Sequence, residues 1–263
     1  MHRHTTTVRI VAVLLAASVL GGCAARRASD PTTTGSIGSA AASRDQVEVL
    51  AERYKASPQD RNATLAYSRA LGLAGRWVEA VAVLRDAVLQ NPGDRDYAAA
   101  YGRALASNGN FEEALKMVRA ANDLRAPDWR LLSAEGAILD QMDQPVEARR
   151  VYAMAMKIAP DEPSLVNNMA LSYLLTNEPT KAEALLRQAS AKPTADARIR
   201  QNLALALGLQ GKFAEAEKIA RADLPPAEAD ANIAYLRAML AQANSWQAIR
   251  KADGAAKAPG KAG

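Results

Sequence analysis

Residues that commonly carry catalysis are scarce in this chain. Both histidines, His2 and His4, and the one cysteine, Cys23, lie within the first 23 residues. Ser-His-Asp and Cys-His nucleophilic schemes need an imidazole or a thiol, and structural zinc sites draw on the same two side chains. No Gly-x-x-x-x-Gly-Lys sequence that could cradle a phosphate is present. We therefore expect a protein that is not an enzyme, binds no metal and needs no cofactor.

Cys23 follows a segment organised like a secretory signal. A polar start with two arginines leads into an apolar run over 10–20, which is too short to cross a bilayer, because a spanning helix needs about 20 apolar residues. The sequence Leu20-Gly21-Gly22-Cys23 resembles a bacterial lipobox. The resemblance implies cleavage of a signal peptide over 1–22 and attachment of diacylglycerol, usually with an N-acyl chain, to Cys23. An ordinary secretory signal with an incidental cysteine is the alternative.

The residues near the two ends of the sequence indicate the membrane in which the protein is expected and the segments that are expected to be flexible. Ala24 follows the cysteine where Asp would favour retention in the inner membrane, so a lipoprotein of the outer membrane, facing the periplasm, is expected. Residues 23–42 are rich in Ala, Ser, Thr and Gly, which predicts a flexible tether. Residues 250–263 predict a disordered basic tail. Much of the net charge of +5 lies in the signal and this tail, so the body is close to neutral and no nucleic-acid partner is expected.

Polar side chains that could bind a partner recur at related places in the remaining chain. Amides can donate to and accept from a partner backbone, so arginine, asparagine and glutamine set between leucines suit an extended peptide or a helix. The predicted peptide-binding groove consists of Asn62, Arg69, Arg103, Arg130, Asn167, Asn168, Leu171, Arg198, Gln201, Asn202 and Leu205. For Asn168 and Asn202, hydrogen bonding within the fold is an equal alternative.

A residue period of 34 defines the elements that must position these side chains. Alanine returns at this spacing five times, and twelve residues before each alanine lies another small residue. Five residues before each alanine comes a residue that tolerates positive φ, namely Gly75, Gly109, Asp143, Asn177 and Gly211. Apolar residues at helical spacing flank the small ones. The pattern predicts helix, tight turn, helix, with small residues where the two helices meet.

The period and the small-residue, turn and proline positions resemble the tetratricopeptide repeat (TPR). The resemblance implies an all-α, right-handed solenoid of about five helix pairs, whose first helices line the concave face. With this phase the five units within 61–230 are 61–94, 95–128, 129–162, 163–196 and 197–230. Because open ends would expose apolar surface, capping helices are expected over 43–60 and 231–249.

Two segments near the C-terminus resemble a particular lipoprotein family. The run Arg200-Gln201-Asn202-Leu203-Ala204-Leu205-Ala206-Leu207-Gly208-Leu209-Gln210-Gly211 continues into Lys212-Phe213-Ala214-Glu215-Ala216-Glu217, and Leu224-Pro225-Pro226 precedes Ala231-Asn232-Ile233-Ala234-Tyr235-Leu236-Arg237. Together with the lipobox, they are similar to the TadD family, the repeat lipoproteins of the Flp or tight-adherence (Tad) pilus system. The resemblance implies a scaffold that acts like a pilotin toward the outer-membrane secretin or binds another Tad component.

Two other functions stay open. A general periplasmic TPR adaptor for outer-membrane protein assembly or cytochrome maturation would use the same groove. A peptidoglycan hydrolase would need paired carboxylates at a cleft, and the pair Glu112-Glu113 instead lies at an expected helix start, where acidic residues complement the helix dipole. The oligomeric state is not indicated by the sequence.

Overall fold

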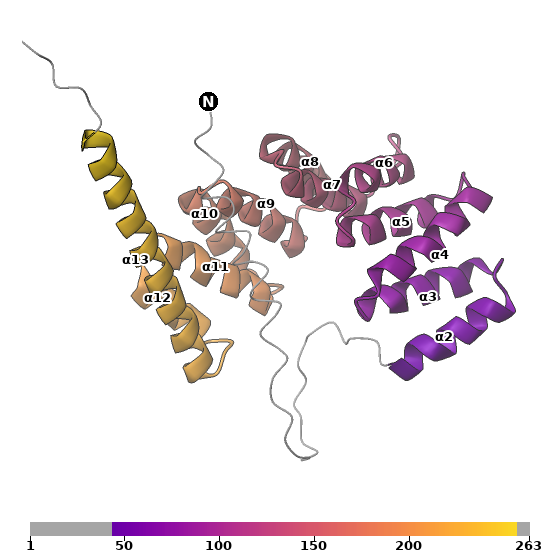
Figure 1. Ribbon diagram of the computed structural model, residues 1–263, viewed down its shortest axis with the longest axis horizontal. Helices are drawn as coiled ribbons and strands as arrows, with labels where there is room; N and C mark the ends of the chain where they lie inside the picture. The colour runs from indigo at the N-terminus through magenta and orange to yellow at the C-terminus, as the bar shows by residue number, and fades with distance from the viewer. Residues whose placement is uncertain (1–43, 257–263) are drawn as a thin grey trace, which may run out of the picture. The chain divides into compact units, whose positions relative to one another are not determined.

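The computed structural model describes the backbone of residues 44–256 and the side chains of residues 44–242. The described residues form twelve α-helices and no β-strand, which confirms the all-α class (Figure 1). The expected signal peptide over 1–22, the tether over 23–42 and the lipidation site Cys23 lie outside the described residues. None of the described helices is both long and apolar enough to span a bilayer.

The helices follow one another with short connections. In chain order they are α2 (Arg44–Ala56), α3 (Arg61–Leu73), α4 (Trp77–Gln90), α5 (Arg95–Ser107), α6 (Phe111–Ala121), α7 (Trp129–Gln141), α8 (Pro145–Ile158), α9 (Pro163–Leu175), α10 (Pro179–Ser190), α11 (Ala197–Leu209), α12 (Phe213–Ala220) and α13 (Pro226–Ala256).

The chain divides within α9 into two compact units. Unit 1 ends at Leu165 and contains α2 to α8, and unit 2 begins at Val166 and contains the rest of α9 with α10 to α13. In unit 1 each helix packs on the next, and α5 also contacts α3 and α7. The first helices of successive pairs therefore lie side by side in unit 1. In unit 2, α11 packs on α10, α12 and α13.

Aspartates fix the starts of four first helices. Asp60, Asp94, Asp128 and Asp196 are the N-caps of α3, α5, α7 and α11, and each carboxylate accepts a hydrogen bond from a backbone N–H of the first turn. This satisfies donors that have no partner within the helix. Pro145 and Pro179 open α8 and α10, where a missing N–H costs nothing.

The five predicted turn residues all have positive φ, between 59° and 85°. At each turn, the N–H of the following residue donates to the carbonyl five residues before it, as from Arg76 to Leu71 and from Lys212 to Leu207. This is the Schellman type of helix ending, which uses carbonyls left over at the end of a helix. The turn prediction is confirmed.

Small residues lie where the helices of a pair meet. The five alanines of the 34-residue series, from Ala80 to Ala216, are each at most 1% exposed. A Cβ added to Gly102 would lie 2.7 Å from Cγ2 of Val118 and 3.2 Å from the carbonyl oxygen of Ala114. Helices α5 and α6 therefore approach closely enough that a methyl group does not fit.

The C-terminal helix differs from its prediction. Helix α13 begins at Pro226, before the expected capping helix over 231–249, and continues to Ala256, inside the tail expected to be disordered over 250–263. Pro226 suits the first helical position, Glu228 lies in the first turn, and the alanine-rich sequence beyond has high helix propensity. Residues 257–263 lie outside the described residues.

Candidate functional site

An open groove of about 1170 Å³ runs across the first helices of unit 1. Its lining includes Arg69 of α3, Arg103 of α5 and Arg130 of α7, three of the predicted site residues. Apolar side chains form much of the remaining surface, namely Leu65, Leu73, Trp77, Leu84, Phe111 and Ile138. The fourth prediction for this unit, Asn62, is exposed in the first turn of α3 and does not line the groove.

Two of the three groove arginines have no acidic partner. Neither Arg69 nor Arg103 forms a hydrogen bond or an ion pair through its side chain within residues 44–242. Although Arg103 reaches solvent, surrounding protein atoms remove part of its hydration, and this burial is the main cause that lowers its pKa. The charge of Arg69 lowers it further, whereas Asp128 acts in the opposite direction. Arginine keeps its charge through such shifts, so the groove contains an unneutralised cation.

Arg130 and Asp96 complete the charged lining. The Arg130 guanidinium lies over the ring of Trp129 at 4.4 Å and is 3.8 Å from an oxygen of Asp128. Asp96 is paired with Arg61, which also donates to Asp94 at 2.7 Å. The groove carboxylate Asp96 is thus paired with an arginine outside the groove lining, and Arg130 is paired with Asp128, whereas Arg69 and Arg103 form no ion pair.

The predicted site residues of unit 2 form a more neutral surface. Asn202 donates from Nδ2 to Oδ1 of Asn167 at 2.7 Å, and Asn168 also has an interaction partner. Leu171 and Leu205 are half-buried, and Gln201 is exposed. Arg198 is exposed and is held by Asp196 at 2.7 Å. The side-chain amides of Asn202 and Asn167 therefore use part of their hydrogen-bonding groups for a contact within the fold.

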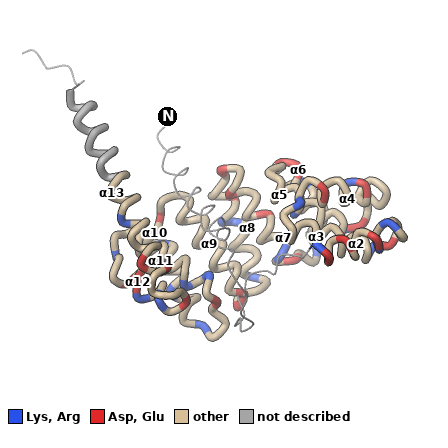
Figure 2. Tube along the Cα trace, turned by 60° about the horizontal axis from the view of Figure 1, so that its bottom comes forward, with Lys and Arg blue, Asp and Glu red and all other residues tan. Residues whose placement is uncertain are grey.

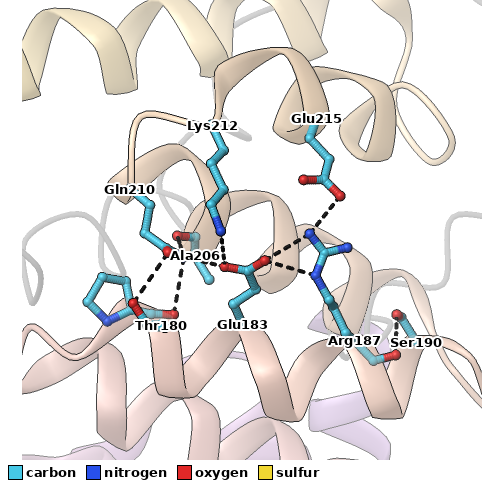
Figure 3. Close-up of polar contacts among 9 residues, drawn as sticks. Thr180, Glu183, Arg187, Ser190, Ala206, Gln210, Lys212 and Glu215 are labelled. Atoms are coloured by element: carbon cyan, nitrogen blue, oxygen red, sulfur yellow. Dashed lines mark hydrogen bonds and ion pairs between the residues drawn. The ribbon is translucent and has the colours of Figure 1, made fainter.

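A buried carboxylate in unit 2 was not predicted as a feature of this chain. Glu183 of α10 accepts hydrogen bonds at 2.7 Å from Lys212 and Gln210 at the α11–α12 turn and at 2.8 Å from Arg187, which also pairs with Glu215 (Figure 3). Burial acts to raise the Glu183 pKa, but these donors outweigh it and lower the pKa to about 2. In the sequence, the four-residue spacing of Glu183 and Arg187 predicts an ion pair between these two residues on one helix. It does not predict the contacts of Glu183 with Gln210 and Lys212.

Many of the described acidic side chains are engaged in contacts within the fold. No cluster of metal-ligating side chains occurs within the described residues. Six carboxyl groups of the described residues have pKa values below their ordinary range, namely Glu79, Asp94, Asp123, Glu147, Glu183 and Asp196. A general acid at neutral pH needs a raised pKa. These six carboxylates serve instead in ion pairs and helix caps.

Family comparisons agree with this arrangement of stacked helix pairs. Models described as tetratricopeptide repeat match residues 74–138 and residues 197–222. Both matched segments span consecutive helices of the described chain, and the described helices form a TPR-like solenoid. A search of curated proteins finds no matching relative. TPR proteins bind protein partners and are in general not catalytic.

Solved TPR structures share the fold. A TPR protein from Parabacteroides merdae has a TM-score of 0.59 at 15% identity, covering 76% of this chain and 79% of its own. A thermophilic TPR protein from Thermus thermophilus has a TM-score of 0.53 at 22% identity, covering 66% and 97%. A chain of the Cut9–Hcn1 hetero-tetramer of APC/C has a TM-score of 0.60 at 14% identity, and the match covers 78% of this chain and 40% of that chain. At these identities the likeness establishes the fold alone.

Proposed function

We propose that this chain is an outer-membrane lipoprotein that assists assembly of the Flp or Tad pilus, acting like a pilotin toward the outer-membrane secretin. In this function lipid on Cys23 anchors the protein in the outer membrane, facing the periplasm. The tether over 23–42 lets the TPR units reach a secretin segment or another Tad component. No step of this function requires catalysis or a cofactor other than the lipid.

The observation that carries the proposal is the groove of unit 1. It presents apolar side chains beside arginines that lack partners, which is the surface a scaffold needs to hold a segment of another protein. The lipobox resemblance and the similarity of the C-terminal segments to the TadD family supply the location and the assembly system. Neither of these depends on the groove.

The decisive experiment separates anchoring from binding. In cells that assemble these pili, we expect Cys23→Ser to release the protein from the outer membrane and to lower the amount of secretin there and the number of pili. The double variant Arg69→Glu with Arg103→Glu should stay anchored and also lower assembled secretin. Unchanged secretin and pili in the Cys23→Ser cells would contradict the proposal.

Photocrosslinking from the groove identifies the partner. A photoreactive residue in place of Leu73, an exposed groove residue, should crosslink to the secretin or another Tad component. The same residue in place of Val78, which is 71% exposed and is not part of the groove lining, is the matched control. Crosslinks to outer-membrane assembly or cytochrome maturation proteins would instead indicate the general adaptor function.

A further inference from the structure

We propose that the groove of unit 1 holds an acidic segment of its protein partner, in which at least two carboxylate side chains are separated by apolar ones. The inference rests on the proposed function, because that function places a protein segment in this groove, and it adds the chemistry of the segment. Charge complementarity, the apolar lining and the spacing of the arginines argue for this occupant.

The positive charge of the groove is local. Figure 2 shows acidic and basic residues interspersed along the helices of unit 1, so the unit does not carry charge of one sign. Other arginines of this unit are paired closely, as Arg76 is with Glu79 and Arg150 with Glu147, both at 2.6 Å. Arg69 and Arg103 have no such partner within the described side chains, and unlike Arg44 and Arg125, which also lack ion pairs, they line the groove.

The carboxylates near the groove are already engaged. Asp96 is paired with Arg61. Asp128 caps α7 by accepting from the N–H of Arg130 at 2.8 Å, and its side chain lies 3.8 Å from the Arg130 guanidinium. Asp128 acts on Arg103 without pairing with it, and no described carboxylate of unit 1 forms an ion pair with Arg69 or Arg103. A carboxylate in contact with these two arginines must therefore come from outside the described residues of unit 1.

Partial loss of water makes such a counter-charge favourable. Surrounding atoms already remove hydration from Arg103, which lowers its pKa, and the charge of Arg69 adds to this. Part of the free-energy cost of desolvating the Arg103 cation is therefore already present in the free protein. This cost is offset only when an anion binds beside the guanidinium. A partner carboxylate beside either arginine would gain charge-assisted hydrogen bonds from its guanidinium.

The apolar lining favours an amphipathic peptide over a simple anion. Leu65, Trp77, Phe111 and Ile138 lie in the same groove as the arginines. Its volume of about 1170 Å³ also exceeds the range of about 300 to 1,000 Å³ typical of small-molecule pockets. A nucleic acid would satisfy the arginines and could stack bases on Trp77 and Phe111, but it would leave Leu65 and Ile138 without apolar partners.

The arrangement of the helices indicates the spacing of the carboxylates. Arg69, Arg103 and Arg130 lie on α3, α5 and α7, and α5 contacts both of the others. Packed helices lie about 8 to 10 Å apart. A segment in the polyproline II conformation rises about 3.1 Å per residue with about three residues per turn, so every third side chain lies on the same side of it. An acidic residue at about every third position would therefore meet successive arginines.

Fluorescence anisotropy with defined peptides tests the inference. The first probe has Glu at every third position between Leu and Val, with acetylated and amidated ends, so that no terminal carboxylate contributes. The second replaces each Glu by Gln. With the purified lipoprotein in detergent, we expect the Glu peptide to bind at least about tenfold more tightly than the Gln peptide, and the difference to shrink as salt rises.

Charge reversal locates the binding. The double variant Arg69→Glu with Arg103→Glu should lose at least about tenfold in affinity for the Glu peptide and should gain affinity for a version with Lys in place of Glu. The control is Arg44→Glu with Arg125→Glu, which makes the same charge change in unit 1 at arginines without ion pairs outside the groove. A merely unfolded variant would not gain binding to the Lys peptide.

The other outcomes separate this inference from the proposed function. Equal affinity for the Glu and Gln peptides would overturn the acidic preference, whereas the proposed function would stand, because the groove would still hold a protein segment. Binding of neither peptide, or binding of a fluorescent single-stranded oligonucleotide alone through Arg69 and Arg103, would overturn the inference. The amount of outer-membrane secretin in cells that carry the Cys23→Ser variant tests the proposed function independently of these peptide measurements.

Discussion

Asn202 of α11 donates a hydrogen bond from its side-chain nitrogen to the side-chain oxygen of Asn167 of α9, over 2.7 Å. The two residues lie 35 positions apart, at nearly the same place in successive repeats. The bond therefore ties two first helices together within unit 2. It also leaves further donors and acceptors on both amides, since each carries two N–H groups and an oxygen with two lone pairs. Packing and partner binding can thus use the same residues.

We expect Asn202→Ala to lower the free energy of unfolding by about 1 kcal/mol, because one partly buried hydrogen bond is lost. Urea denaturation of the purified protein measures this. Asn167→Ala should cost a similar amount, and the double variant should cost less than the two combined. Gln201→Ala, at an exposed neighbour, is the control and should change stability by less than about 0.5 kcal/mol. Strictly additive losses at 167 and 202 would contradict a direct coupling.

Repetition explains which features could be predicted from the sequence. A turn with positive φ and a contact that admits only a small side chain restrict the residue type at one position, and the array imposes the restriction again in each repeat. Asp143 and Asn177 could therefore be placed with Gly109 although they are not glycines. The resulting phase placed Arg69, Arg103 and Arg130 on the first helices, and the structure brings these three into one groove.

Features that occur only once in the chain do not recur with the 34-residue period, so the period could not predict them. Glu183 acquires its partners from Gln210 and Lys212, which are 27 and 29 residues away, and their meeting depends on side-chain geometry at one turn. Asn62 has the expected place in its helix, but the groove begins beyond it. The start of α13 at Pro226 reflects a local preference for proline at the first helical position, which the repeat phase does not contain.

We expect Glu183→Gln to lower the free energy of unfolding by about 1 to 2 kcal/mol at pH 7, because Arg187 and Lys212 lose the negative charge between them and one of the two oxygens that accept their hydrogen bonds. The estimate is modest since these two cations are 43% and 45% exposed, and water screens them. Glu215→Gln, which removes an exposed carboxylate from the same network, is the matched control and should cost less. Equal losses in both variants would contradict a special role for the buried carboxylate.

The stabilisation from Glu183 should also depend on pH. The pKa of Glu183 in the folded protein is about 2, whereas a glutamate in the unfolded chain has a pKa of about 4.3. The folded pKa is depressed, so the stabilisation is fully present above the unfolded value and is lost as the pH falls through the folded value. The difference in unfolding free energy between wild type and Glu183→Gln should shrink between about pH 5 and pH 2. A constant difference over this range would show that the carboxylate charge is not responsible.

Gly102→Ala should destabilise unit 1 by about 1 to 3 kcal/mol. The added methyl would lie 2.7 Å from Val118 Cγ2 and 3.1 Å from the Val118 backbone nitrogen, so α5 and α6 would have to separate. Gly93→Ala is the control, because a Cβ at Gly93 would meet nothing within 4 Å and its φ is not in the left-handed region. Thermal unfolding followed by circular dichroism compares them. A Gly102→Ala protein as stable as Gly93→Ala would mean that the helix pair can relax without cost.

The turn residues offer a test of backbone conformation without packing. Gly109 has a φ of +85°, and a Cβ there would meet nothing within 4 Å, so Gly109→Ala changes only the cost of the left-handed conformation. We expect it to lower the free energy of unfolding by about 1 kcal/mol. Asp143 has a φ of 59° in the equivalent turn of the next repeat, and Asp143→Gly should relieve the same strain and raise stability by up to about 1 kcal/mol. Urea denaturation of both variants measures these changes. Effects of the same sign in the two variants would show that local hydrogen bonding of the aspartate, rather than φ, governs the turn.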